Sequence, residues 1–351
     1  MRVSGQLAFA NVRARARLAR LCGPEVTAHL AMVHEPAARA AALRKLGGDG
    51  DAASLMAARL VRLVDDYLVL GRAYPFGGEL IAALGRLHEI ENLKLLWRAV
   101  VRGAAPASPA SSPPSGVVPW RRLWRPLGAL ATLPLARAEE VRSMADLRAL
   151  AADSPYGDLV AAAAATPAGD ATAELAFDRF GSERLADEAR RLPASEVESR
   201  RLVEMLVRER DLDVVRRAAA YGLDVTMVAA ATVLLGRERG ADRLAELAAW
   251  TPAHGPLGAL LPPALLGRET VAAEWDEVTR ALRRRRRHAC AVALVGAPLR
   301  LAPGVAYLLL AEEELRGLVA LAEAAGGATA GALRVALDAA LSGSALGDER
   351  C

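Results

Sequence analysis

The histidines and cysteines of this 351-residue chain are the side chains best suited to bind a metal or to attack a substrate, and their spacing supports neither role. No two histidines have the spacing of an HExxH zinc motif, and no CxxC pair is present. The cysteines are odd in number and far apart, which argues against a disulfide framework and favours a reducing compartment. We therefore expect no metal, no cofactor and no catalytic residue. The histidines and cysteines of the chain are His29, His34, His88, His254, His288, Cys22, Cys290 and Cys351.

Phosphate binding through a glycine-rich loop is also not expected. The chain has no GxxxxGK[ST] motif. Its one glycine-rich stretch, AGGATAGAL at 325–333, has no lysine and no preceding strand.

The strongest local charge is LRRRRRH at 282–288, which contains Arg284, Arg285, Arg286 and Arg287 as candidate partner contacts. Consecutive arginines encircle a helix, so they cannot all face one partner. Two interpretations stay open: a solvated helix end, or contact with an acidic partner or anionic lipid headgroups. No nucleic-acid partner is expected, because no aromatic residues are interleaved with the arginines.

Composition indicates that helices position these residues. Hydrophobic residues make up 53% of the chain and aromatic residues only 4%, so the core must consist mainly of Ala, Leu and Val. Strand-favouring residues are sparse, and Ala and Leu favour helices. We predict an all-α protein. A net charge of +4 is weak evidence for any class of partner.

The segment HEIENLKLLWRAV at 88–100 has the clearest helical periodicity. Its apolar residues share one arc of the helix, and Lys94 and Arg98 lie opposite. Glu89 falls inside the apolar arc, and two interpretations stay open for it. It is either a first-turn carboxylate favoured by the helix dipole, or a buried partner for an arginine of another helix.

Two further segments carry predictions. Glu312, Glu313 and Glu314 lie at helical spacing from Arg316, which predicts surface ion pairs, with pairing between repeats as the alternative. The apolar stretch 289–311 is long enough to span a bilayer, but its Gly and Pro residues and Arg300 predict two shorter buried helices joined by a turn.

Similar segments recur along the chain. Asn92 and Asp211 are 119 residues apart, and so are Pro36 and Pro155, while a shorter third copy sets Gly317 against Asn92. The stretch 103–119 is rich in Pro and Ser and is predicted to be a linker. We predict three helical repeats: 1–119 including the linker, 120–236 and 237–351.

The ordered set of motifs resembles the family of C subunits of the rotary V/A-type ATPases, which are known as d subunits in eukaryotes. HEIENLKLLWRAVVRG resembles its first-repeat signature, PLRLAPGVAYLLLAEEELRGLVAL resembles its third repeat, and RERDLDVVRRA corresponds to the first-repeat signature with Asp in place of Asn. The residues that carry the match, all candidate repeat-packing residues, are Glu89, Asn92, Leu93, Arg98, Asp211, Arg217, Gly304, Tyr307 and Glu314.

The resemblance implies a funnel of three similar helical bundles around a pseudo-threefold axis. It also implies a non-catalytic central-stalk connector that couples a membrane rotor ring to a central shaft during ATP-linked proton or sodium transport. Such a connector is peripheral to the cytoplasmic face of the membrane and has no small-molecule substrate. The alternatives are a free-standing helical-repeat adaptor and, more remotely, an enzyme that uses a buried Glu89.

Overall fold

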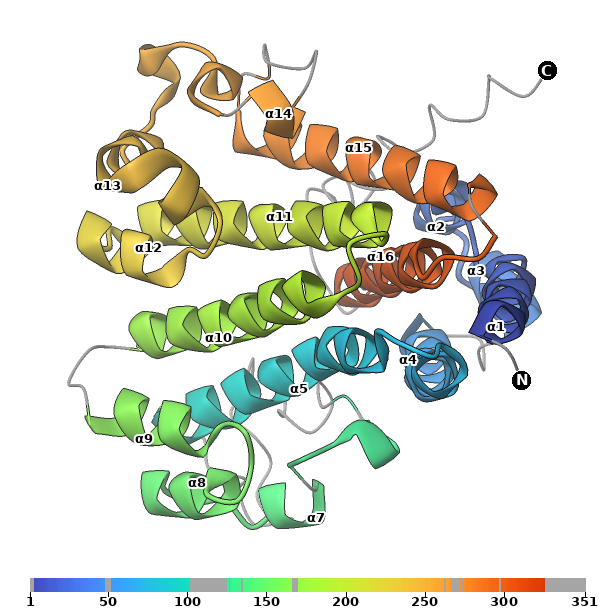
Figure 1. The fold of residues 1–351 in the computed structure, drawn as a ribbon. Coiled ribbons are helices and arrows are strands. Elements are labelled where there is room, and N and C mark those ends of the chain that lie inside the picture. Colours follow the sequence, from blue (N-terminus) through green and yellow to red (C-terminus); the bar gives the residue numbers. More distant parts are fainter. Residues whose placement is uncertain are drawn as a thin grey trace. The chain divides into compact units, whose positions relative to one another are not determined.

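The computed structural model describes residues 3–47, 52–101, 125, 127–133, 135–165, 170–261, 263–266, 272, 274–296 and 298–325. Every regular element in these ranges is a helix (Figure 1). The prediction of an all-α protein is confirmed.

The long helices form three pairs that are consecutive in the sequence. The pairs are α4 (Ala52–Ala73) with α5 (Gly78–Val101), α10 (Asp170–Arg191) with α11 (Val197–Tyr221), and α15 (Trp275–Val295) with α16 (Ala302–Ala325). Their lengths are 22 and 24, 22 and 25, and 21 and 24 residues, so the second helix of each pair is slightly longer. The first residues of α5 and α11 are 119 positions apart, which is the offset between Asn92 and Asp211.

Shorter helices occupy the remaining described segments. Local capping explains where some of them begin: Glu35 accepts the N–H groups of Ala37 and Ala38 at the start of α3, and Ser143 forms a reciprocal capping box with Asp146 at the start of α8. The α-helices are α1 (Val3–Leu18), α2 (Pro24–Met32), α3 (Pro36–Lys45), α7 (Leu135–Ala138), α8 (Met144–Ala151), α9 (Gly157–Ala165), α12 (Val225–Ala231), α13 (Leu235–Ala248) and α14 (Pro263–Leu266). The 3-10 helices are η1 (Gly128–Leu130), η2 (Pro252–His254) and η3 (Leu257–Leu260).

The chain divides into two compact units, each built from separate segments. Unit 1 comprises 1–81, 189–209 and 250–351, and unit 2 comprises 82–188 and 210–249. Three of the four boundaries fall within α5, α10 and α11, and the fourth follows α13. Three consecutive repeats at 1–119, 120–236 and 237–351 stay a prediction, and the predicted linker at 103–119 lies outside the described residues.

In unit 1, α16 is the central helix and packs against α4, α15, α1 and α2. Its first ten residues are almost entirely buried. Gly304 allows the close approach there, because a Cβ atom at this position would clash with the ring of Tyr74. The hydroxyl of Tyr74 in turn donates to the Asn11 side chain of α1.

In unit 2, the core forms around aromatic residues of α5 and α10. Trp97 and Phe177 make an edge-to-face contact with ring centroids 5.5 Å apart, and Tyr156 contacts Phe180 in the same way at 5.6 Å. Leu93 is completely buried in this cluster. These contacts attach α8 and α9 to the long helices.

The stretch 289–311 is divided between α15 and α16, with a break after Val295. The predicted turn between two helices is therefore confirmed. Burial is confirmed for the α16 part, whereas the end of α15 leaves Val292 and Val295 exposed. Within the described ranges, no helix combines the length and the apolar character needed to cross a bilayer.

Candidate functional site

The arginine run lies within α15 and is not a solvated helix end. Arg286 is 1% exposed and pairs with Glu209 of α11 and with Glu313 of α16, the latter at 3.4 Å. Arg287 pairs with Glu313 at 2.7 Å. Arg286 and Arg287 are therefore bound inside unit 1, because carboxylates from other helices meet the side of α15 on which they lie.

Burial and the neighbouring charges shift the pKa values of this cluster in opposite directions. Burial alone would lower the pKa of Arg286, but Glu209 and Glu313 raise it above its ordinary value. Burial raises the pKa of Glu209 despite the attraction of Arg286. Glu313 is also buried, but Arg286 and Arg287 together lower its pKa. The pKa values of the two carboxylates shift in opposite directions because only Glu313 contacts both arginines.

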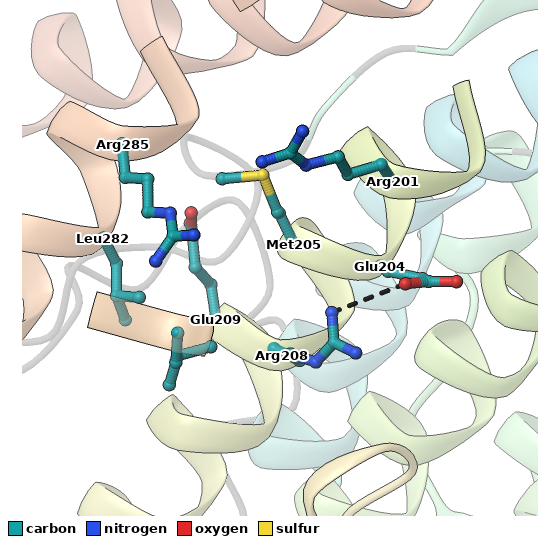
Figure 2. Close-up of a pocket in the computed structure, with 8 residues that line it drawn as sticks. Arg201, Glu204, Met205, Arg208, Glu209, Leu282 and Arg285 are labelled. Carbon is teal, nitrogen blue, oxygen red and sulfur yellow. Dashed lines mark hydrogen bonds and ion pairs between the residues drawn. The ribbon is translucent and has the colours of Figure 1, made fainter. Parts of the chain in front are cut away.

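A cavity of about 260 Å³ lies between α11, α14 and α15 in unit 1. Figure 2 shows Arg285 and Leu282 extending from α15 toward the residues that α11 contributes. Glu204 pairs with Arg208, one turn further along α11, at 3.5 Å. The lining residues are Arg201, Glu204, Met205, Arg208, Glu209, Leu265, Leu282 and Arg285. They offer recognition of negative charge, since arginines outnumber carboxylates and each lining carboxylate already has an arginine partner.

Glu89 differs from both interpretations of its role. Because α5 begins at Gly78, Glu89 lies in the middle of the helix and not in its first turn. Its carboxylate accepts the backbone N–H groups of Thr132 and Leu133, and the hydroxyls of Thr132 and Tyr156. Backbone N–H and hydroxyl donors, and not an arginine, satisfy this buried acid.

Asn92 and Arg98 attach α5 to other segments of unit 2. The Asn92 amide donates to the carbonyl of Arg125 at 2.8 Å and accepts the N–H of the same residue at 2.9 Å. Arg98 forms a bidentate pair with Glu174 of α10, and this hydrogen-bonded pairing raises the arginine's pKa.

Asp178 is the centre of a buried network that sequence reasoning missed. It accepts from Lys94, from Arg217 and, at 3.2 Å, from Arg210. Burial would raise its pKa, but Lys94, Arg210 and Arg217 lower it to about 2. Lys94 is 3% exposed, although its place on the helical wheel predicts a solvated face. The available signal in the sequence was the position of Asp178 among the apolar residues of ELAFDRF.

Asp211 binds a run of three backbone N–H groups. They belong to Val233, Leu234 and Leu235 at distances of 2.7–3.0 Å. Burial raises the pKa of Asp211 in spite of these donors. The N–H groups lie at the start of α13, so one side chain holds α13 against α11.

The three consecutive glutamates of α16 contact different neighbouring segments of unit 1. Glu312 accepts the Tyr67 hydroxyl, and Glu313 belongs to the Arg286 cluster. Glu314 is buried, accepts the N–H of Cys22 at 2.8 Å and lies 3.6 Å from Arg59. For Glu313 and Glu314 the prediction of solvated ion pairs is wrong, because these two acids face other segments of unit 1.

Tyr307 also ties α16 to α4. Its hydroxyl donates to Asp66, which is paired with Arg17 of α1 at 2.7 Å. Burial raises the pKa of Asp66, while Tyr307 and Arg17 oppose that shift.

One arrangement recurs in the three long-helix pairs. Glu89, Asp211 and Glu314 each lie on the second helix of a pair, are buried, and accept backbone N–H groups from a segment at or just before the start of a shorter helix. In each pair this carboxylate thus links a long helix to the segment that leads into a shorter helix. In the described ranges, no group of three or more His, Cys, Asp or Glu side chains could hold a metal ion.

Comparison with known proteins adds one finding. The family model described as ATP synthase (C/AC39) subunit matches residues 52–326, from the start of α4 to just beyond α16. No curated protein matches the chain.

Proposed function

Because the chain belongs to the family of the ATP synthase (C/AC39) subunit, we propose that it is a non-catalytic central-stalk connector of a V/A-type ATPase. In this role it couples the membrane rotor ring to the central shaft during ATP-linked proton or sodium transport. The family match over residues 52–326 is the observation that carries the proposal.

The proposed architecture is three helical repeats around a pseudo-threefold axis, forming a funnel. Two observations support it: the long-helix pairs have matching lengths, and a buried carboxylate on the second helix of each pair binds backbone N–H groups. Recurrence of both features is expected if the pairs are copies of one unit.

A connector of this kind must transmit torque without yielding. Close-packed helices resist compression, and buried charge pairs hold neighbouring helices in one arrangement. The Arg286 and Asp178 networks each join three helices through charged hydrogen bonds. Their composition suits a stiff body better than a catalytic site.

The proposed partners are the ring subunits and the shaft subunits, at the cytoplasmic face of the membrane, with no small-molecule substrate. Of the candidate partner contacts, Arg285 is the best supported, since it lines the cavity in unit 1 and, within the described ranges, its Nη1 atom has no hydrogen-bond partner. An acidic side chain of the shaft would complement it.

Co-purification tests the proposal. An affinity-tagged full chain isolated from its native membranes is expected to bring the ring and shaft subunits with it. Cells lacking the chain should retain ATP hydrolysis by the catalytic subunits but lose ATP-driven ion transport. A chain that stays monomeric, or whose removal leaves ion transport intact, contradicts the proposal.

Arg285→Glu tests the contact itself. We expect it to weaken association with the shaft subunits at least about tenfold, because it places like charges together. Arg148→Glu is the matched control, since Arg148 is exposed on α8 of unit 2 and makes the same charge change. Equal effects of the two variants would remove Arg285 from the contact.

A further inference from the structure

Exposed apolar side chains concentrate on one part of unit 1. Eleven large apolar residues are exposed in the described ranges, and five of them lie either beyond the first turn of α1 or in the stretch from the end of α15 to the turn before α16. Val295 is 86% exposed, Val12 64% and Phe9 51%. We call these five residues the α1/α15 surface: Phe9, Val12, Val292, Val295 and Leu299.

Hydrogen bonds hold the two segments of this surface together. Asn11 donates to the carbonyls of Pro298 and Arg300, and Arg15 Nε donates to the carbonyl of Leu294 at 3.1 Å. Figure 1 shows α1 beside the turn that joins α15 to α16. The two segments that carry the apolar side chains are therefore fixed to each other, and α1 is not a loose arm.

Arginines lie on the same two segments as these apolar groups. Arg13, Arg15 and Arg20 are exposed on α1 or directly after it, and the Arg13 guanidinium lies 4.7 Å from the centroid of the Phe9 ring. Arg300 is half-buried in the turn. Neither α1 nor the stretch 289–301 contains an acidic residue.

Acids on neighbouring elements reduce this positive charge only in part. Asp65 and Asp66 of α4 are both paired with Arg17. Glu198 of α11 is exposed, and its carboxylate lies 3.8 Å from where a Cβ of Gly296 would be. The two segments therefore combine exposed apolar side chains with an excess of positive charge.

We propose that the α1/α15 surface binds an anionic lipid bilayer. Aliphatic and aromatic side chains enter the boundary between headgroups and acyl chains, while arginines bind the lipid phosphates. This inference rests on the proposed function, which places the chain at a membrane. It moves membrane contact from the arginine run of α15, where Arg286 and Arg287 are bound internally, to a different part of unit 1.

The exposure of these side chains favours lipid over an acidic protein as the occupant. A stable protein interface buries about 800 Å² on each partner with close shape complementarity. A side chain that is 86% exposed projects from its surroundings, and a bilayer accepts projecting apolar groups without a matching shape.

Co-sedimentation of the full chain with lipid vesicles tests the inference. We expect binding to vesicles that contain about one-third phosphatidylglycerol, weak binding to pure phosphatidylcholine vesicles, and release by salt. Arg13→Gln with Arg20→Gln should lower the partition coefficient by at least about tenfold, since each arginine near an anionic surface is worth about fivefold. Phe9→Ser with Val295→Ser should lower it by a similar factor.

Matched control variants test whether vesicle binding is specific to this surface. Val61→Ser removes an apolar side chain that is 59% exposed on α4, and Arg148→Gln removes an exposed arginine from α8. Both should bind vesicles as the unaltered chain does. Equal binding to neutral and anionic vesicles, or equal loss in the controls, overturns the inference.

Two further outcomes distinguish this inference from the proposed function. Suppose that the unaltered chain does not bind vesicles but binds solubilised ring subunits through Phe9 and Val295. The surface then binds protein, so the lipid inference is wrong and the proposed function is still supported. If the chain binds vesicles as expected but never co-purifies with ring and shaft subunits, the proposed function fails and the lipid surface stands.

Discussion

The buried charge networks of the two units have opposite polarity. In unit 2, one carboxylate, Asp178, lies among Lys94, Arg210 and Arg217. In unit 1, one guanidinium, Arg286, lies between Glu209 and Glu313. The central group of the first network can be neutralised by acid, whereas an arginine stays charged at every accessible pH.

This difference determines what holds each network together. The cations around Asp178 have other partners, since Lys94 also binds Glu91 and Arg217 also binds Asp213. Glu209 depends on Arg286, because its second oxygen is buried without a hydrogen bond within the described ranges. Removal of the centre should therefore cost more in unit 1.

The largest expected effect follows from Arg286→Met. The substitution keeps much of the length of the side chain but leaves Glu209 without its cation in a buried environment. We expect the free energy of unfolding to fall by about 3–5 kcal/mol, measured by urea denaturation. Arg280→Met on the same helix is the control, because Arg280 is not one of the residues paired in the Arg286 cluster. Equal losses in both variants would show that the buried pairing contributes nothing specific.

Asp178→Asn should have the next largest effect. It leaves three cations around a neutral amide, but their other partners limit the cost, so we expect a loss of about 2–4 kcal/mol by the same measurement. A loss larger than that of Arg286→Met would reverse the comparison between the two units.

The pH dependence of stability should reveal the Asp178 network. Its folded pKa of about 2 lies below the ordinary value of 3.8, so the stabilisation is present above the ordinary value and is lost as the pH falls toward 2. We expect about 2 kcal/mol to disappear over that interval. Stability measured at a series of pH values should decline less steeply in Asp178→Asn. Parallel curves for the two proteins would contradict the assignment.

Asp213→Asn should have the smallest effect. Asp213 contacts Arg216 at 2.9 Å and Arg217 at 3.0 Å, but 47% of its side chain is exposed. Water and salt screen such pairs, so we expect a change below about 0.5 kcal/mol. A change as large as that of Asp178→Asn would show that pairing by itself, and not burial, sets the energy of these contacts.

Much of the fold could be predicted from local properties. Few β-branched and aromatic residues predict helices, and the Gly and Pro residues after position 295 predict the break between α15 and α16. The 119-residue offset predicts the spacing of α5 and α11. These features depend on propensity and on spacing along one chain, and both are present in the sequence.

The environment of the charged residues could not be predicted in this way. A helical wheel places Lys94 on the polar face of α5, because it assumes a single buried side. Lys94 is nevertheless buried, because it pairs with Asp178, which is 84 positions away in the sequence. The arginine run in α15 poses the same problem, since Arg286 is buried only because α11 and α16 supply carboxylates.

The sequence by itself determined the helical class, the spacing of the long-helix pairs and the membership of the C/AC39 family, because each depends on residue types and their order. Only the tertiary structure decided which charges are buried and which surface stays apolar and basic. Whether a charge tolerates burial depends on the counter-charges that distant segments bring to it, and a local pattern contains no information about those segments.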